Sequence, residues 1–230
     1  MSAAGSAGRT IRSVVVFDLD DTLYLERHYV ESGLRAVGCW AEVQLGIPGA
    51  GEDLVDRFRR GGRGHLFDEL LADAGVQPRR DLIQRMLQAY RLHRPAIGLA
   101  ADSIRYFARR PADCAVAIIT DGFIDAQKRK IRALGLHALG VEQAICTDRW
   151  GRADWKPSMR AFICLQSCYD LPEQAFTYVA DNPAKDFHAP KRMGWKTVQV
   201  HRSDRIDRSL PDAIVAADVE IDSLDSFPSA

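Results

Sequence analysis

Five short apolar runs, each of strand length and bounded by polar residues, constrain the fold of this chain more than any other feature. They cover residues 13–17, 115–119, 144–146, 176–180 and 197–200. Their apolar character is continuous rather than alternating, which indicates strands buried on both faces. Helical patterns lie between the runs over residues 126–134, 158–166 and 184–193, and residues 219–224 add a last short strand and turn. The chain therefore predicts an α/β fold with a Rossmann-like doubly wound parallel sheet.

The stretch between the first and second runs is far longer than a crossover connection requires. Helical patterns fill it, over residues 28–45, 52–58, 65–74 and 80–92. The apolar positions of the first and last of these patterns fall on one face, as they do in a helical bundle. We predict a small α-helical domain at residues 25–98, inserted into a sheet-containing core at 11–24 and 99–230. The Gly-, Ala- and Ser-rich residues 1–10 are predicted to be a disordered tail.

The charge balance points to a small partner. The chain has 31 Lys and Arg against 31 Asp and Glu, so it lacks the basic field that nucleic-acid or anionic-membrane binding requires. No apolar stretch approaches the roughly 20 residues of a membrane span, and the first residues lack the apolar core of a signal peptide. The five cysteines form no CxxC pair and are expected to be reduced packing residues. We expect a cytoplasmic protein with no nucleic-acid or membrane partner; a homodimer is compatible with this expectation.

Acidic and hydroxyl side chains follow three of the predicted strands where each strand ends. They are Asp18 and Asp20 after the first run, Thr120 and Asp121 after the second, and Asp181, with Asp186 shortly beyond, after the fourth. Because the carboxyl ends of parallel strands share one edge, we expect these side chains to converge. Converging carboxylates need protonation or a cation, and an all-oxygen set suits Mg²⁺. Lys156, which precedes Pro157 at a predicted helix start, adds one positive charge to this edge.

At these positions the chain resembles the haloacid dehalogenase superfamily, and within it the phosphatases that carry a helical cap after the first strand. The resemblance covers roughly residues 13–225. Four motifs match in order, and they comprise Asp18, Asp20 and Thr22, then Thr120, then Lys156, and last Asp181 with Asp186. Two positions depart from the family pattern, Asp21 and Ala180, where glycine is common. Both changes lie at turns, and we expect a slight adjustment of geometry without loss of activity.

The resemblance implies a role for each matched residue in the hydrolysis of a phosphate monoester. Asp18 would attack phosphorus and form an aspartyl-phosphate, while Asp20 would protonate the leaving oxygen and later deprotonate water. The implied ligands of Mg²⁺ are Asp18, the main-chain carbonyl of Asp20, Asp181 and Asp186. The implied phosphoryl-binding groups are Thr120, the amides that follow it, including that of Asp121, and Lys156.

Three other functions are compatible with this pattern. A 2-haloacid dehalogenase uses the same fold and an Asp nucleophile, but halide leaves without a proton and those members lack the second Asp of the first motif. Asp20, with the pair Asp181 and Asp186, therefore favours a phosphatase. A phosphomutase shares all four motifs and returns the phosphoryl group to a substrate hydroxyl instead of water. A catalytically silent binding module is the third alternative, and loss of any one motif would have supported it.

The leaving group of the substrate is expected to be selected by the helical cap. Sugar phosphates and nucleoside monophosphates are the leading substrate classes. Arg63 and His65, beside the Gly-rich run at residues 61–64, are candidate substrate-binding residues. A solvated turn is the alternative interpretation of this short segment.

Overall fold

The structure is a computed structural model that describes residues 10–206 and 215–227. Contacts within the chain define two compact units. Among the described residues, the sheet unit comprises 10–25, 99–127, 135–206 and 215–227, and the helical unit comprises Glu26–Gly98 and Lys128–Leu134. The tail predicted at residues 1–10 falls outside the described residues except for Thr10. The sequence analysis placed all of residues 99–230 in the core, whereas the contacts group Lys128–Leu134 with the helical unit.

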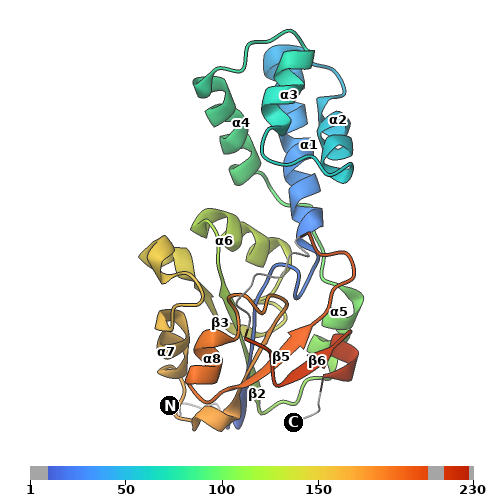
Figure 1. The fold of residues 1–230 in the computed structure, drawn as a ribbon. Coiled ribbons are helices and arrows are strands. Elements are labelled where there is room, and N and C mark those ends of the chain that lie inside the picture. Colours follow the sequence, from blue (N-terminus) through green and yellow to red (C-terminus); the bar gives the residue numbers. More distant parts are fainter. Residues whose placement is uncertain (1–9, 207–214, 228–230) are drawn as a thin grey trace, which may run out of the picture. The chain divides into compact units, whose positions relative to one another are not determined.

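The sheet unit is built on six parallel strands in the order β3-β2-β1-β4-β5-β6 (Figure 1). The strands are β1 (Ser13–Phe17), β2 (Cys114–Thr120), β3 (Val141–Cys146), β4 (Phe176–Ala180), β5 (Lys196–Val200) and β6 (Val219–Ile221). The strand order reverses direction between β1 and β4, as in a doubly wound sheet. The predicted α/β fold class is therefore confirmed.

Four α-helices and four short 3₁₀ helices of the described residues follow or connect these strands. They are α5 (Ala101–Arg109), α6 (Ile124–Ala133), α7 (Arg160–Gln166), α8 (His188–Arg192), η1 (Thr147–Trp150), η2 (Arg152–Asp154), η3 (Glu173–Ala175) and η4 (Leu224–Ser226). The helix predicted at residues 184–193 is wrong at its start. Asn182 Oδ1 accepts the Ala184 N–H at 3.0 Å and Asp186 Oδ2 accepts the Asn182 N–H at 3.1 Å, so this segment forms a turn before α8.

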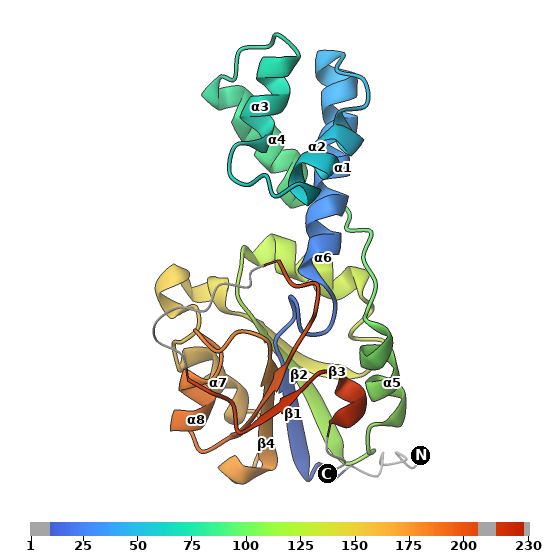
Figure 2. The same ribbon diagram turned by 45° about the vertical axis from the view of Figure 1, so that its right-hand side comes forward.

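Alternate side chains of β1 point to opposite faces of the sheet, and helices cover both faces. Val14 and Val16 belong to a buried cluster that includes side chains of α7 and α8. Phe17 packs instead against Tyr106 of α5, edge to face, with 5.0 Å between ring centroids. Figure 2 shows α7 and α8 on one side of the strands and α5 on the other. Burial on both faces explains the continuous apolar runs of the sequence.

The helical unit is a bundle of four helices joined by short turns. They are α1 (Glu26–Leu45), α2 (Ala50–Arg59), α3 (Leu66–Asp73) and α4 (Arg80–Leu92). Each helix contributes buried apolar residues, among them Leu34, Val37, Leu54, Leu71 and Met86. Glu31 of α1 and Arg59 of α2 form an ion pair at 2.7 Å. The main chains of the same two helices approach so closely that a Cβ added at Gly38 would lie 2.1 Å from the Gly51 main chain.

No helix in residues 10–206 or 215–227 has both the length and the apolar character needed to cross a membrane. The five cysteines are free thiols. Cys39 and Cys168 are exposed, so the expectation that the cysteines serve as packing residues is wrong for these two.

Gly38→Ala is expected to destabilise the helical unit by about 1–3 kcal/mol, the usual cost of overpacking. The added methyl group would overlap the main chain of Gly51 and force α1 and α2 apart. Urea unfolding, combined with amide hydrogen exchange in α1 and α2, measures this change. Gly98→Ala is the matched control, because a Cβ at Gly98 would meet no atom within 4 Å. Equal stability of the two variants would contradict the prediction.

Candidate functional site

Asp18 and Asp181 lie at the carboxyl ends of neighbouring strands. Strands β1 and β4 pair in register up to Phe17 and Val179, and the Asp18 N–H donates to the Val179 carbonyl at 2.9 Å. Asp186 reaches the same place from the turn before α8. Carboxylate oxygens of Asp18, Asp181 and Asp186 all lie within 4.8 Å of one another. The structure therefore brings together three of the residues that the sequence analysis selected as metal ligands.

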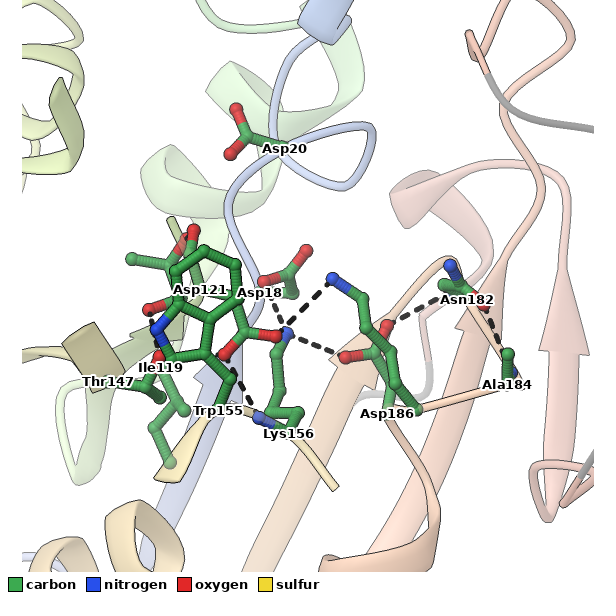
Figure 3. A network of polar contacts seen from close by, with 12 residues as sticks. Asp18, Asp20, Ile119, Asp121, Thr147, Trp155, Lys156, Asn182, Ala184 and Asp186 are labelled. Carbon is green, nitrogen blue, oxygen red and sulfur yellow. Dashed lines mark hydrogen bonds and ion pairs between the residues drawn. The ribbon is translucent and has the colours of Figure 1, made fainter. Parts of the chain in front are cut away.

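The ammonium group of Lys156 lies inside this acidic cluster. Its Nζ is 2.6 Å from carboxylate oxygens of both Asp18 and Asp186 (Figure 3). It also donates to the Tyr178 hydroxyl at 3.1 Å. The Lys156 side chain is completely buried, and the residue precedes Pro157 through a cis peptide bond. Removing one partner of a buried ion pair is strongly destabilising, so Lys156, Asp18 and Asp186 depend on one another.

Burial and mutual repulsion govern the protonation of the cluster. Burial raises the pKa of Asp18 to about 6, with Lys156 opposing the rise and Asp186 adding to it. Burial, followed by the charges of Asp186 and Asp18, raises the pKa of Asp181 to about 8. Burial by itself lowers the pKa of Lys156, but the carboxylates of Asp18 and Asp186 outweigh it and hold that pKa well above its usual value. The ammonium groups of Lys156 and Lys185 thus leave the repulsion among three carboxylates incompletely compensated.

A divalent cation would offset the remaining repulsion among the three carboxylates. The donor atoms of Asp18, Asp181 and Asp186 are all carboxylate oxygens, which are the ligands that hard cations prefer. Their mutual separation is short enough for one ion to contact all three. The residues present therefore fit Mg²⁺.

Asp121 connects the end of β2 to three neighbouring segments. Its Oδ1 accepts hydrogen bonds from the Thr147 hydroxyl at 2.7 Å and from the Lys156 N–H at 3.1 Å, and its Oδ2 lies 3.5 Å from Lys185 Nζ. Burial opposes ionisation of Asp121, but the charges of Lys156 and Lys185 outweigh it and lower its pKa below the usual value. The carboxylate thus anchors the main chain of Lys156. Phosphate binding by the Asp121 amide stays a prediction.

The carboxyl group of Asp20 lies apart from the acidic cluster (Figure 3). Its Oδ1 accepts a short hydrogen bond from the Tyr24 hydroxyl, and its Oδ2 accepts one from Gln127 Nε2 at 2.8 Å. The same Nε2 lies 3.1 Å from the hydroxyl oxygen of Thr120. Gln127 therefore links the residue predicted as acid and base to the residue predicted to bind the phosphoryl group.

The two departures from the family pattern occupy tight positions. Asp21 has a φ of +51°, a left-handed conformation that favours glycine but that aspartate tolerates better than most residues. Its Oδ2 accepts the Ile206 N–H at 3.2 Å. Ala180 ends β4 and is fully buried. The turn after β1 is also bound by Arg202, whose guanidinium donates to the Thr22 carbonyl at 2.6 Å.

Arg63 and His65 belong to the helical unit, in the segment between α2 and α3. The Arg63 guanidinium donates to the carbonyls of Phe58 at 2.9 Å and Gly62 at 2.7 Å, and it stacks over the Phe58 ring at 4.2 Å from the centroid. His65 is the exposed residue that precedes α3. These contacts give Arg63 a role in closing its own turn. Substrate binding by either residue stays a prediction.

Three residues around the site were not predicted from the sequence: Gln127, Tyr178 and Arg205. Lys185, interpreted from the sequence as a surface residue, lies in the turn that carries Asp181 and Asp186, with its Nζ 3.5 Å from Asp121 Oδ2. The phenol of Tyr178, in the strand β4, is a weak signal. Gln127 and Arg205 have none, because Asp20 and Asp181, which they contact, lie 107 and 24 residues away in sequence; Arg205 donates to the Asp181 carbonyl at 3.1 Å.

Comparison with solved structures finds this fold in proteins of low sequence identity. The HAD-hydrolase YfnB from Bacillus subtilis, bound to magnesium, has a TM-score of 0.65 and 17% identity, over 95% of this chain and 97% of that chain. A 2-haloacid dehalogenase from Pseudomonas syringae has a TM-score of 0.63 and 21% identity, over 95% and 97% of the two chains. For the L-2-haloacid dehalogenase from Xanthobacter autotrophicus the values are 0.58 and 18%, over 95% and 97%. At these identities the likeness concerns the fold alone.

The family of this chain is shown by its sequence. Comparison with curated proteins finds no match to this chain. Residues 13–194, however, match the haloacid dehalogenase-like hydrolases. This stretch includes β1 to β4 and the acidic cluster with Lys156. The chain therefore belongs to the haloacid dehalogenase-like hydrolase family.

Proposed function

We propose that the protein is a Mg²⁺-dependent phosphatase that hydrolyses a small phosphate monoester through an aspartyl-phosphate at Asp18. The observation that carries the proposal is the buried cluster in which Lys156 Nζ lies 2.6 Å from both Asp18 and Asp186, beside Asp181. A carboxylate attacks a phosphate dianion against charge repulsion, and Lys156, together with the cation that the carboxylates would hold, offsets that repulsion at the nucleophile. Asp20 supplies the separate carboxyl group that proton transfer requires.

In the first step a carboxylate oxygen of Asp18 attacks phosphorus. The bond between Asp18 and phosphorus forms, the bond from phosphorus to the leaving oxygen breaks, and that oxygen takes a proton from Asp20. Lys156 stabilises the negative charge at the reacting centre, and Thr120 with the Asp121 amide binds the phosphoryl oxygens. With its pKa raised to about 6, Asp18 is mainly ionised near neutral pH, which is the form that attacks.

In the second step water attacks the phosphorus of the aspartyl-phosphate. The water gives a proton to Asp20, and the bond between Asp18 and phosphorus breaks. Phosphate leaves, and both carboxyl groups return to their starting forms. Tyr24 and Gln127 each donate a hydrogen bond to Asp20, which supports the ionised form that accepts this proton.

The proposed ligands of Mg²⁺ are Asp18, Asp181, Asp186 and the main-chain carbonyl of Asp20. When bound, the ion would stabilise the charge that develops on the transferring phosphoryl group. The three carboxylates within 4.8 Å of one another support this assignment. The magnesium-bound structure of the B. subtilis protein, which has the same fold, gives it further support.

A 2-haloacid dehalogenase is the second candidate, because similar structures from Pseudomonas syringae and Xanthobacter autotrophicus carry that description. Halide leaves without a proton, so a dehalogenase has no use for Asp20 as an acid. It also needs no cation at Asp181 and Asp186. The residue set of this chain therefore favours phosphate chemistry over dehalogenation. A phosphomutase would use the same residues and differs only in the hydroxyl that receives the phosphoryl group.

The helical unit is proposed to act as the cap that selects the leaving group. The proposed residues of the sheet edge contact the phosphoryl group, which every monoester shares, so discrimination has to come from elsewhere. Sugar phosphates and nucleoside monophosphates remain the proposed substrate classes. Arg63 and His65 are the proposed contacts of the helical unit with the substrate.

Hydrolysis of p-nitrophenyl phosphate is expected to require Mg²⁺ and to stop when EDTA is added. The physical reason is the uncompensated repulsion among Asp18, Asp181 and Asp186. Release of chloride from 2-chloropropionate, measured in parallel, is expected to stay at background. Chloride release without phosphate release would show that the protein is a dehalogenase and not a phosphatase. Equal phosphatase rates with and without Mg²⁺ would contradict the proposed metal requirement.

Asp18→Asn is expected to abolish turnover and covalent labelling by radioactive phosphate, because the amide is a poor nucleophile. Asp20→Asn is expected to lower kcat by about 10²–10⁴-fold, the usual contribution of a general acid and base. The phosphoenzyme can still form in this second variant. The exposed Asp170→Asn is the matched control and should behave as wild type. Wild-type turnover in Asp18→Asn would mean that another residue attacks phosphorus.

Mg²⁺ is expected to raise the melting temperature more at about pH 9 than at about pH 6. The pKa of Asp181 rises from 3.8 to about 8 in the metal-free fold, so the folded state binds the proton more tightly than the unfolded state. The stability of the metal-free protein therefore falls as pH rises through about 8. Over the same pH range fewer protons compete with Mg²⁺ for Asp181, so Mg²⁺ binds more tightly and stabilises the fold more. Asp181→Asn should lose this pH dependence. A Mg²⁺-induced rise of the same size at both pH values in the wild type would contradict the assignment.

A further inference from the structure

Gln127 is a buried polar residue whose contacts extend beyond its hydrogen bond to Asp20. It lies in the first half of α6 and is 2% exposed. Its Nε2 donates to Asp20 Oδ2 at 2.8 Å, lies 3.1 Å from Thr120 Oγ1 and makes a short hydrogen bond to the Asp121 carbonyl. One amide group therefore contacts the proposed acid and base together with the proposed phosphate-binding end of β2.

The surroundings of Gln127 indicate that this amide is retained for its donor group. Its Oε1 is buried and has no hydrogen-bond partner among the described residues. An unsatisfied buried acceptor is destabilising, so an apolar residue would suit the position better if only packing mattered. Gly122 makes room for the amide, since a Cβ at that position would lie 2.9 Å from Gln127 Nε2. The unpaired Oε1 and the space left by Gly122 thus both indicate that the Nε2 donor is the reason for a glutamine at this position.

We propose that Gln127 is a positioning residue that holds the Asp20 carboxyl group in place relative to the phosphoryl group, an inference that rests on the proposed role of Asp20 as acid and base. Tyr24 binds Oδ1 of Asp20 while Gln127 binds Oδ2, so the two donors determine how the carboxyl group is turned. Because the same amide contacts Thr120 and Asp121, it also keeps Asp20 at a constant distance from the end of β2. Proton transfer depends on such positioning.

The test compares p-nitrophenyl phosphate with phenyl phosphate. The two esters have similar shapes, but p-nitrophenolate leaves without protonation far more readily than phenolate does. Gln127→Met removes the donor and keeps the side-chain length. We expect kcat/KM for phenyl phosphate to fall by about tenfold to a hundredfold, the effect of losing one hydrogen bond to a charged group. The loss for p-nitrophenyl phosphate should be several times smaller.

The matched control is Gln166→Met on α7. This amide accepts a hydrogen bond from Trp195 Nε1 at 2.9 Å and is not part of the site. It should leave the ratio of the two kcat/KM values unchanged. Gln127→Glu, which keeps the shape of the side chain but replaces the donor by an acceptor, serves if Gln127→Met fails to fold and should show the same selective loss. Equal losses on both esters, or no loss on either, would overturn the positioning role.

A double-mutant cycle separates this inference from the proposed function. If Gln127 acts through Asp20, then Gln127→Met should cost little further activity on phenyl phosphate in an Asp20→Asn background. Additive losses would overturn the inference while leaving Asp20 as acid and base. Wild-type activity of Asp20→Asn alone would instead overturn the proposed function. The two failures are therefore distinguishable.

Discussion

The buried ammonium group of Lys156 is the interaction on which the rest of the site depends. It lies 2.6 Å from both Asp18 and Asp186, so it orients one carboxylate at the end of β1 and another in the turn after β4. Without it, three carboxylates at one edge would have to be protonated, separated or exposed to water. Its own main chain is held by Asp121, whose Oδ1 accepts the Lys156 N–H at 3.1 Å. Asp18 after β1 and Asp121 after β2 therefore fix the position of the Lys156 ammonium group without a ligand.

The end of β2 connects two systems of polar contacts that serve different parts of the proposed reaction. Asp121 belongs to the first system, through its hydrogen bond with the Lys156 N–H beside the nucleophile. Thr120 belongs to the second, through the Gln127 amide that also binds Asp20. The last residue of one buried strand and the residue after it thus relate the proposed nucleophile to the proposed acid and base. A strand with both faces covered is a rigid support, and catalytic geometry benefits from such rigidity.

The fold does not decide which reaction this family member catalyses. Structures of similar fold include 2-haloacid dehalogenases and a magnesium-bound hydrolase, each below 25% identity to this chain. The distinction rests on a few side chains at the sheet edge, because fold and chemistry vary independently. In the proposed phosphatase, Asp20 serves as acid and base and Asp181 as a metal ligand, whereas a halide leaves without a proton.

The sequence by itself determined the fold class, the order of the motifs and the strands, except for the start of β3, which was predicted at residue 144 and lies at Val141. β1 and β4 occupy the predicted residues, since continuous apolarity reports burial on both faces and an acidic residue marks each end. The start of α8 was predicted wrongly, because hydrogen bonds of Asn182 and Asp186 within their own turn compete with the helix. Only the tertiary structure decided that Gln127 contacts Asp20. Local periodicity carries information about which face is buried, whereas the partner of a buried polar group is chosen by packing between segments remote in sequence.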